Sequence, residues 1–147
     1  MNSHHTVAIG TWEGDKQQSI EYNSSIAVGI DCPRAKLRVS ILLDTIQEYQ
    51  VRYIFSDEEI SEAVNEAGLI IGARGIAYEG VLQRKPVIVV GEYGFGGLVT
   101  PDTLHEQYNN YFRGKINGIK AEYFSLERLE EEIRRGFALT FQELQMM

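Results

Sequence analysis

The sequence predicts an α/β domain with a Rossmann-like, three-layer architecture and a mostly parallel sheet. Strand-like runs alternate along the chain with helix-like runs, which is the pattern of βαβ units. Two runs, Leu69–Ile71 and Pro86–Val90, lack the polar–apolar alternation of a half-exposed strand. The 147 residues, 44% of them hydrophobic, fit one domain with a core that needs no disulfide. We therefore expect a single domain over residues 1–147, with these two strands at its centre and helices on both faces.

The first half of the chain contains three expected strands. Thr6–Trp12 and Ser25–Asp31 are β-prone and are separated by a polar stretch, and Val51–Ser56 follows a helix from about Arg34 to Tyr49. Ser56-Asp57-Glu58-Glu59 matches a capping box, in which the serine and glutamate side chains accept bonds from N–H groups at a helix start. The helix that this box opens places four apolar residues on one face: Ile60, Ala63, Val64 and Ala67.

The second half is expected to contain the two central strands. A turn at Gly72–Gly75 and a helix from Ile76 to Arg84 lie between them, and a glycine-rich loop from Gly91 to Gly97 follows the second. Thr100 and Pro101 suit the first positions of a helix that ends at Arg113-Gly114. One last amphipathic helix is expected near the end of the chain. Its solvent-exposed face is expected to carry the ion pairs Glu130–Arg134 and Glu131–Arg135. Its apolar face comprises Leu126, Leu129, Ile133, Phe137, Phe141 and Leu144.

Composition excludes several classes of partner. The formal net charge of −7 argues against nucleic acid, whose binding depends on neutralising phosphates, although a local pocket can still hold a small anion. Cys32 is the single cysteine, which fits a reducing compartment. We see no signal peptide and no window near the roughly 18 apolar residues of a transmembrane helix. The expected location is cytoplasmic, and neither a metal nor a resident cofactor is expected because zinc spacings and a P-loop are absent from the sequence.

The strand, turn and helix from Leu69 to Gly80 form the first candidate site. Parallel sheets bind ligands beyond the carboxyl ends of their strands. Gly75 can adopt a backbone conformation that is costly for other residues, and the N–H groups of Ile76 and Ala77 would be free to bind a phosphate. Arg74 can clamp that phosphate, and Glu79 can accept hydrogen bonds from a ribose. In the alternative interpretation the glycines only turn the chain, and Glu79 only favours the helix dipole.

The run from Gly68 to Val90 resembles the C-terminal, donor-binding half of GT-B glycosyltransferases, whose architecture the UDP-N-acetylglucosamine 2-epimerases share. In those families a strand, a glycine turn and a helix bearing glutamate precede a Pro-Val-Ile-Val strand. Gly75, Glu79 and Pro86–Val89 stand in those places here. The resemblance implies a single GT-B half in which the Gly75 turn faces the diphosphate of a nucleotide-sugar and Glu79 faces its ribose.

The resemblance extends more weakly over about residues 25–135. Arg34 and Lys36 fall where a basic pair often meets the donor diphosphate. The chain departs from the family at Gly80, where alanine is usual, and at Arg84-Lys85 before the proline. A chain of 147 residues also supplies only one of the two halves of a GT-B enzyme. The resemblance therefore implies an acceptor-binding partner chain or a homo-oligomer, with the catalytic base unknown.

The loop from Gly91 to Asp102 is the second candidate site, because in the resembled family it lies near the donor sugar. Gly94, Gly96 and Gly97 would let the backbone approach a ligand, Glu92 is placed to bond sugar hydroxyls, and the helix start at Thr100 offers another anion site. The alternative is a mobile surface loop with Tyr93 and Phe95 packed on the domain. His105 can be a general base or a polar surface residue, and Cys32 is expected to be small and buried.

These features predict a domain that holds the diphosphate and ribose of a nucleotide-sugar substrate during glycosyl transfer, with a second half or partner chain. Two alternatives stay open. One is a non-catalytic nucleotide- or sugar-binding module, and the other is an epimerase-like fragment that acts on UDP-sugars.

Overall fold

The computed structural model describes residues 4–13, 16–114, 119–120, 123–139 and 141–147, with the backbone alone described at 4–13, 16–23 and 141. Its main sheet has five strands in the spatial order β4-β3-β5-β6-β7. The strands are β3 (Ser25–Gly29), β4 (Gln50–Tyr53), β5 (Leu69–Gly72), β6 (Val87–Gly91) and β7 (Gly94–Leu98). The first four are parallel, and β7 runs antiparallel to β6.

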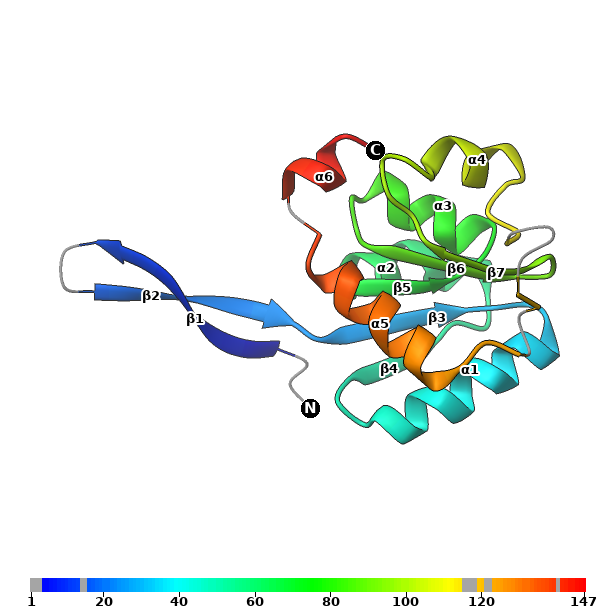
Figure 1. Ribbon diagram of the computed structural model, residues 1–147, viewed down its shortest axis with the longest axis horizontal. Coiled ribbons are helices and arrows are strands. Elements are labelled where there is room, and N and C mark those ends of the chain that lie inside the picture. Colours follow the sequence, from blue (N-terminus) through cyan, green and yellow to red (C-terminus); the bar gives the residue numbers. More distant parts are fainter. Residues whose placement is uncertain (1–3, 14–15, 115–118, 121–122, 140) are drawn as a thin grey trace.

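Helices cover both faces of this sheet, which confirms the three-layer α/β fold. The helical segments are α1 (Pro33–Ile46), a 3-10 turn η1 (Asp57–Glu59), α2 (Ile60–Glu66), α3 (Gly75–Leu82), α4 (Leu104–Asn109), α5 (Leu126–Phe137) and α6 (Phe141–Gln145). One face of the sheet lies against α1 and α5, and the other lies against α2 and α3 (Figure 1). Among the described residues, no helix is both long and apolar enough to cross a membrane.

The central strands are apolar throughout because both of their faces are buried. In β5, Leu69 and Ile71 pack in the cluster with α1 and α5, whereas Ile70 packs in the cluster with α2 and α3. Every residue of β5 and of β6 is buried. The expectation that Leu69–Ile71 and Val87–Val90 are central parallel strands is confirmed.

Glycines allow α3 to lie close to the sheet. A Cβ atom on Gly80 would lie 2.6 Å from Cγ2 of Val87, and one on Gly29 would lie 2.7 Å from Cδ1 of Ile76. Both distances are shorter than a van der Waals contact. Gly80, where the resembled family has alanine, is therefore explained by close packing of helix on sheet. The same packing places the start of α3 over the carboxyl ends of β3 and β5.

The polar stretch expected between the first two strands is itself a strand. β1 (His4–Glu13) and β2 (Lys16–Asn23) pair in an antiparallel, two-stranded sheet of their own. This hairpin extends away from the rest of the molecule (Figure 1). The strand expected at Thr6–Trp12 is confirmed, but the neighbouring segment was misread because backbone pairing in a hairpin does not need an apolar side chain at each second position.

The glycine-rich segment after β6 is a strand and not a loop. Gly91 pairs with Gly94, so the chain reverses through Glu92 and Tyr93 and returns as β7. A Cβ atom on Gly96 would lie 3.1 Å from Cβ of Val89, which makes that glycine a packing residue. The sequence expectation of a loop was wrong because glycine there serves close contact between strands and not chain flexibility.

Two helix starts differ from those expected. The helix expected from Thr100-Pro101 to Arg113-Gly114 runs from Leu104 to Asn109. It begins later because Thr103 Oγ1 accepts a bond from the Thr100 N–H at 2.8 Å, which holds residues 100–103 in a turn. At the capping box, Ser56 Oγ donates to Glu59 Oε1 at 3.1 Å, and neither side chain caps a backbone group. The chain therefore enters α2 through the 3-10 turn η1.

The last helix is interrupted. α5 ends at Phe137 and α6 begins at Phe141, where one continuous helix was expected. The ion pairs recorded on α5 join Glu132 to Arg128 at 3.3 Å and to Arg135 at 3.0 Å, and not the expected glutamates at 130 and 131. Glu132 is buried against the sheet, with its side chain only 3% exposed, so its carboxylate needs both arginines.

Candidate functional site

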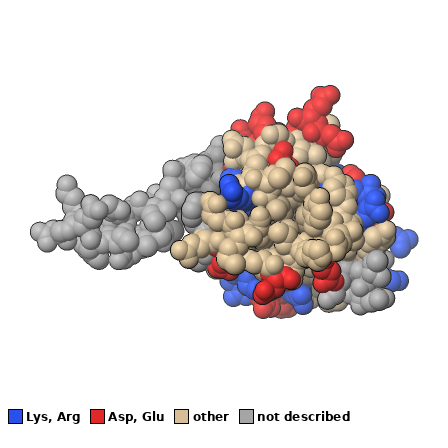
Figure 2. Space-filling model, turned by 90° about the horizontal axis from the view of Figure 1, so that it is seen from above, with Lys and Arg blue, Asp and Glu red and all other residues tan. Residues whose placement is uncertain are grey.

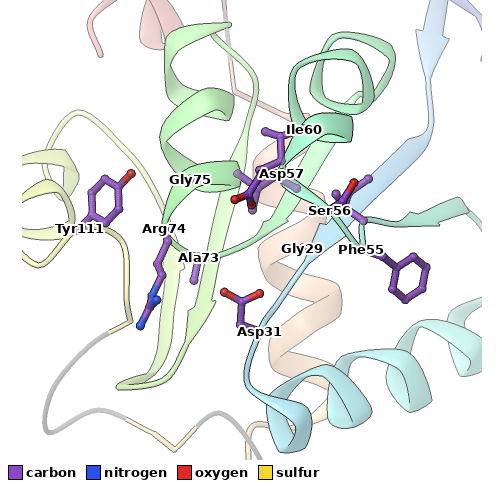
Figure 3. A pocket seen from close by; sticks show the side chains of 12 residues that line it. Gly29, Asp31, Phe55, Ser56, Asp57, Ile60, Ala73, Arg74, Gly75 and Tyr111 are labelled. Carbon is purple, nitrogen blue, oxygen red and sulfur yellow. The ribbon is translucent and has the colours of Figure 1, made fainter.

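A cavity lies between β3 and β5, where the chain stops adding strands on one side of β3 and starts adding them on the other. β3 and β5 are neighbours, but α1 leads from β3 to β4 on one side, and α3 leads from β5 to β6 on the other. Doubly wound sheets bind ligands at such a switch point, beyond the carboxyl ends of the strands. The cavity has a volume of about 450 Å³, within the range of small-molecule sites. It is lined by Gly29, Asp31, Ile54, Phe55, Ser56, Asp57, Ile60, Ala73, Arg74, Gly75, Ile76 and Tyr111 (Figure 3).

The N-terminus of α3 opens at this cavity. The first bond within the helix runs from the Tyr78 N–H to the Arg74 carbonyl at 2.9 Å. The N–H groups of Gly75, Ile76 and Ala77 therefore have no partner within the helix. Gly75 and Ile76 line the cavity, whereas the Ala77 side chain is fully buried on the sheet.

A backbone conformation that is costly for residues other than glycine, considered for Gly75, occurs at Arg74, which has φ 56° and ψ −125°. A non-glycine residue in such a region costs on the order of 1–3 kcal/mol and persists where its surroundings hold it. The Arg74 N–H donates to the Phe112 carbonyl at 3.1 Å, and the Ala73 N–H donates to the Gly29 carbonyl at 3.3 Å. These bonds hold the turn, so it has no need of glycine's conformational freedom. The absence of a Cβ atom at Gly75 instead keeps the helix start open.

Two carboxylates and one guanidinium stand among the lining side chains. Asp31 follows β3 and Asp57 begins η1, and Figure 3 shows both carboxylates extending into the space between the loops that follow β3, β4 and β5. Arg74 lies beside them. The cavity thus offers acceptors for hydroxyl groups on one part of its wall, and N–H donors for an anion at the start of α3.

Glu92 is engaged with two arginines. Arg74 Nη2 donates to Glu92 Oε1, and Arg113 Nε lies 3.4 Å from the same oxygen. The hydrogen bond from Arg74 lowers the pKa of Glu92 and, reciprocally, raises the pKa of Arg74. A second cavity of about 300 Å³ adjoins this pair and shares Asp31, Ala73 and Arg74 with the first. The Glu92 carboxylate, expected to meet sugar hydroxyls, is therefore held by cations.

The other candidates near α3 lie outside the lining. Glu79 is half-buried, on the stripe of α3 that faces α2: a Cβ atom on Gly75 would lie 3.8 Å from Ile60, and Gln83 Nε2 donates to the Ser61 carbonyl at 3.1 Å. Glu79 is thus one turn from the cavity. Lys36 places its Nζ 4.3 Å from the ring centroid of Phe55, at the cavity edge, whereas Arg34 is exposed in the first turn of α1.

The residues of the second candidate segment are separated from the cavity. Gly94, Gly96 and Gly97 belong to β7, the edge strand farthest from β4, and Thr100 bonds to Thr103 in the turn before α4. None of the four is among the residues that line the cavity at β3 and β5. Of this segment, Glu92 is bonded to Arg74.

Sequence reasoning did not identify nine of the twelve residues that line the cavity, and these include four with side chains that could contact a ligand. Asp31, Phe55 and Asp57 each come shortly after a parallel strand, and that position was a usable signal. Tyr111 lines the cavity and, like its neighbour Phe112, has a left-handed backbone, with φ 56° and 55°. Nothing local in the sequence marks that conformation or the approach of Arg113 to Glu92.

His105 and Cys32 have other surroundings. His105 is exposed and lines an apolar hollow between α3 and α4, away from the cavity. Cys32 is half-buried and not buried as expected, and it lines the second cavity at the start of α1. The described residues contain no group of three or more side chains that could hold a metal ion.

Comparisons with protein-family models, with curated proteins and with solved structures find no match to this chain. The assignment of a function therefore depends on the position of the cavity and the chemistry of its lining. The lining comprises an α3 N-terminus whose first N–H groups have no partner within the helix, two carboxylates and Arg74, and Arg74 is bonded to Glu92 of the second cavity.

Proposed function

We propose that this chain is the nucleotide-sugar-binding domain of a glycosyltransferase, and that it holds a nucleoside diphosphate in the cavity between β3 and β5. The observation that supports this most directly is the start of α3. Its first N–H groups, which have no partner within the helix, open at the switch point of a doubly wound sheet, where backbone donors and the helix dipole favour a phosphate.

The rest of the lining suits the remainder of a nucleotide. Asp31 and Asp57 can accept hydrogen bonds from ribose hydroxyls, as acidic residues do in dinucleotide folds. Phe55, Ile60 and Tyr111 supply apolar surface against which a base can pack. The sequence suggested Glu79 as the ribose acceptor. Glu79 can have this role if the ligand extends one turn along α3, into the space between that helix and α2.

The chemical contribution of such a domain is electrostatic. Helix N–H groups and arginine stabilise the charge that develops on a departing nucleoside diphosphate. The acceptor and the catalytic base would come from a partner chain or a second copy. A mainly uncharged surface over α3 and α4 suits such an interface (Figure 2), since its hollow is lined by Tyr78, Val81, Leu104 and Tyr108. The single cysteine favours a cytoplasmic setting.

Titration calorimetry with UDP, GDP, ADP, dTDP and inorganic pyrophosphate tests the proposal. At least one nucleoside diphosphate should bind more tightly than pyrophosphate, because it adds ribose and base contacts. Binding of none of the four would contradict the proposal. Binding without sugar transfer, in the presence of any partner chain, would instead favour a non-catalytic nucleotide-binding module, and epimerisation or hydrolysis of a UDP-sugar would favour the epimerase-like alternative.

Two matched variants identify the ribose acceptor. Asp57→Asn and Glu79→Gln each remove one charge and keep the size of the side chain. Bonds to a charged acceptor contribute roughly 1.5–3 kcal/mol, so the variant that removes the acceptor should weaken nucleoside diphosphate binding about tenfold or more. Pyrophosphate binding should hardly change. An equal loss for both ligands would show that the residue acts through the field or the fold.

A further inference from the structure

Three charged side chains from three separate loops meet at the second cavity, which two of them, Arg74 and Glu92, line. Arg74 follows β5, Glu92 stands in the turn between β6 and β7, and Arg113 follows α4. A single oxygen, Glu92 Oε1, is in contact with both guanidinium groups. The three side chains are between 39% and 45% exposed, so a ligand can reach all of them from solvent.

We propose that Arg74 and Arg113 form the anion clamp of this site, and that Glu92 is a resident counter-ion which the ligand's diphosphate displaces. The inference depends on the proposed function for the identity of the anion. It adds Arg113 as a binding residue, and it gives Glu92 a role opposite in sign to the binding of sugar hydroxyls.

The hydrogen-bonding capacity of the arginines exceeds what Glu92 uses. Each guanidinium has five N–H donors in a planar fork that matches the oxygens of a phosphate. Arg113 Nε is buried and has no hydrogen-bond partner among the described residues, because its 3.4 Å approach to Glu92 is an ionic contact without hydrogen-bond geometry. Arg113 Nη1 donates to the Tyr93 hydroxyl at a long 3.3 Å. A diphosphate, with more acceptor oxygens than one carboxylate, satisfies donors that Glu92 leaves without partners.

The clamp is continuous with the start of α3. Arg74 lines both cavities and immediately precedes Gly75, whose N–H is the first free donor of the helix. A diphosphate can therefore place one phosphate at the helix N-terminus and the other between the arginines. A single charged group cannot occupy both places, so the arrangement favours diphosphates over monophosphates.

Displacing Glu92 requires little rearrangement. The loops that carry the arginines are joined by backbone hydrogen bonds from Arg74 N–H to the Phe112 carbonyl, 3.1 Å, and from Tyr93 N–H to the Arg113 carbonyl, 2.8 Å. These bonds stay in place when the Glu92 side chain rotates, because they involve main-chain atoms alone. Glu92 is exposed in a short turn, so a change of its rotamer is enough to release both guanidinium groups.

Calorimetry on the full chain at low salt tests the role of Glu92. Glu92→Gln removes the competing charge, so pyrophosphate should bind about two- to fivefold more tightly, the range expected for an exposed ion pair. Asp31→Asn is the matched control: it removes the same charge from the lining of the second cavity, but Asp31 acts on Arg74 at longer range and forms no ion pair with an arginine among the described residues. Its effect should be clearly smaller.

The role of Arg113 is tested by Arg113→Gln, alone and combined with Glu92→Gln. The single change should weaken pyrophosphate binding at least about threefold, and the double variant should lose the gain that Glu92→Gln gives by itself. Thermal unfolding checks that each variant is folded. If Arg113→Gln does not fold, the comparison of Glu92→Gln with Asp31→Asn still decides the matter.

The outcomes separate this inference from the proposed function. A nucleoside diphosphate that binds the natural chain and Glu92→Gln equally, or more weakly to the variant, overturns the counter-ion and leaves the proposed function standing. If Asp31→Asn tightens pyrophosphate binding as much as Glu92→Gln does, the counter-ion role of Glu92 is also overturned, because loss of any nearby negative charge then has the same effect. Tighter pyrophosphate binding in Glu92→Gln, with no nucleoside diphosphate preferred over pyrophosphate, supports the clamp and contradicts the proposed function. No binding of either anion to any variant overturns both.

Discussion

At the scale of single residues, the candidate site is organised around charges that compensate one another. Glu92 stands against Arg74 and Arg113, and the same arginine turn carries a left-handed backbone held by Phe112 and Gly29 through main-chain bonds. Pairs of exposed charges contribute little to stability, so their measurable consequence is a change in titration and not in folding.

The pKa of Glu92 is the direct measure of this contact. The hydrogen bond from Arg74 lowers that pKa below its ordinary 4.5. Because the folded pKa is the lower one, the pair stabilises the fold above the ordinary pKa, and this contribution is lost as the pH falls through the folded value. We expect NMR titration to give a midpoint below 4.5, and we expect Arg74→Gln to raise it. Arg113→Gln should raise it less, and added salt should raise it in the natural chain.

A Glu92 midpoint at or above the ordinary value in the natural chain would contradict the contact. A midpoint that stays low in Arg74→Gln would show that another group lowers it.

At the scale of elements, the position of α3 depends on glycines that face the sheet. Gly80 lies against Val87 and Ile70, whereas a Cβ atom built on Gly75 at the helix start would meet Ile60, at 3.8 Å, and no other described residue beyond its chain neighbours and its own helix backbone within 4 Å. The two glycines of one helix therefore have different roles: one permits close packing, and the other keeps the cavity wall open.

Alanine substitutions separate these roles. Gly80→Ala places a methyl group 2.6 Å from Val87 Cγ2, so it should destabilise the fold by about 1–3 kcal/mol through overpacking. Gly75→Ala meets Ile60 at an ordinary 3.8 Å and should leave stability unchanged or raise it by up to about 1 kcal/mol, as alanine favours helix. Urea unfolding monitored by circular dichroism measures both, at equal m-values. Equal losses in the two variants would contradict this packing of α3.

At the scale of the whole molecule, the structure comprises a three-layer α/β body and a projecting hairpin (Figure 1). Within the part of the chain that the structure describes, β1 pairs only with β2, and the main sheet begins at β3, immediately after the buried Ser24. Among the residues whose side chains the structure describes, those that form the cavity and both apolar clusters lie beyond the hairpin.

Removal of residues 1–23 should therefore leave the body folded. We expect the shortened chain to unfold cooperatively, with a Tm within about 4 °C of the full chain, which corresponds to roughly 1 kcal/mol or less for a domain of this size. Differential scanning calorimetry measures this. A loss of cooperative unfolding would mean that the hairpin contributes to the stability of the body.

Local composition predicts the layers of this protein correctly. Every residue of Leu69–Ile71 and Val87–Val90 is apolar, because both faces of these strands are buried and a polar side chain on either face would lose its contact with water. The sequence also marked the start of α3 as a place for a ligand, because a helix that follows a parallel strand begins at the carboxyl edge of the sheet. These features follow from local composition and connectivity.

Contacts between residues that are distant in the sequence follow from the tertiary structure. β2 is mostly polar and three of the five residues of β7 are glycine, so no regular apolar alternation predicted either strand. The left-handed turn at Arg74 and the contact of Glu92 with Arg113 are made between loops that are distant in the chain. These loops are brought together by the close packing of α3 on the sheet and by the return of the chain after α4. The spacing of residues within a short stretch of sequence therefore does not predict such contacts.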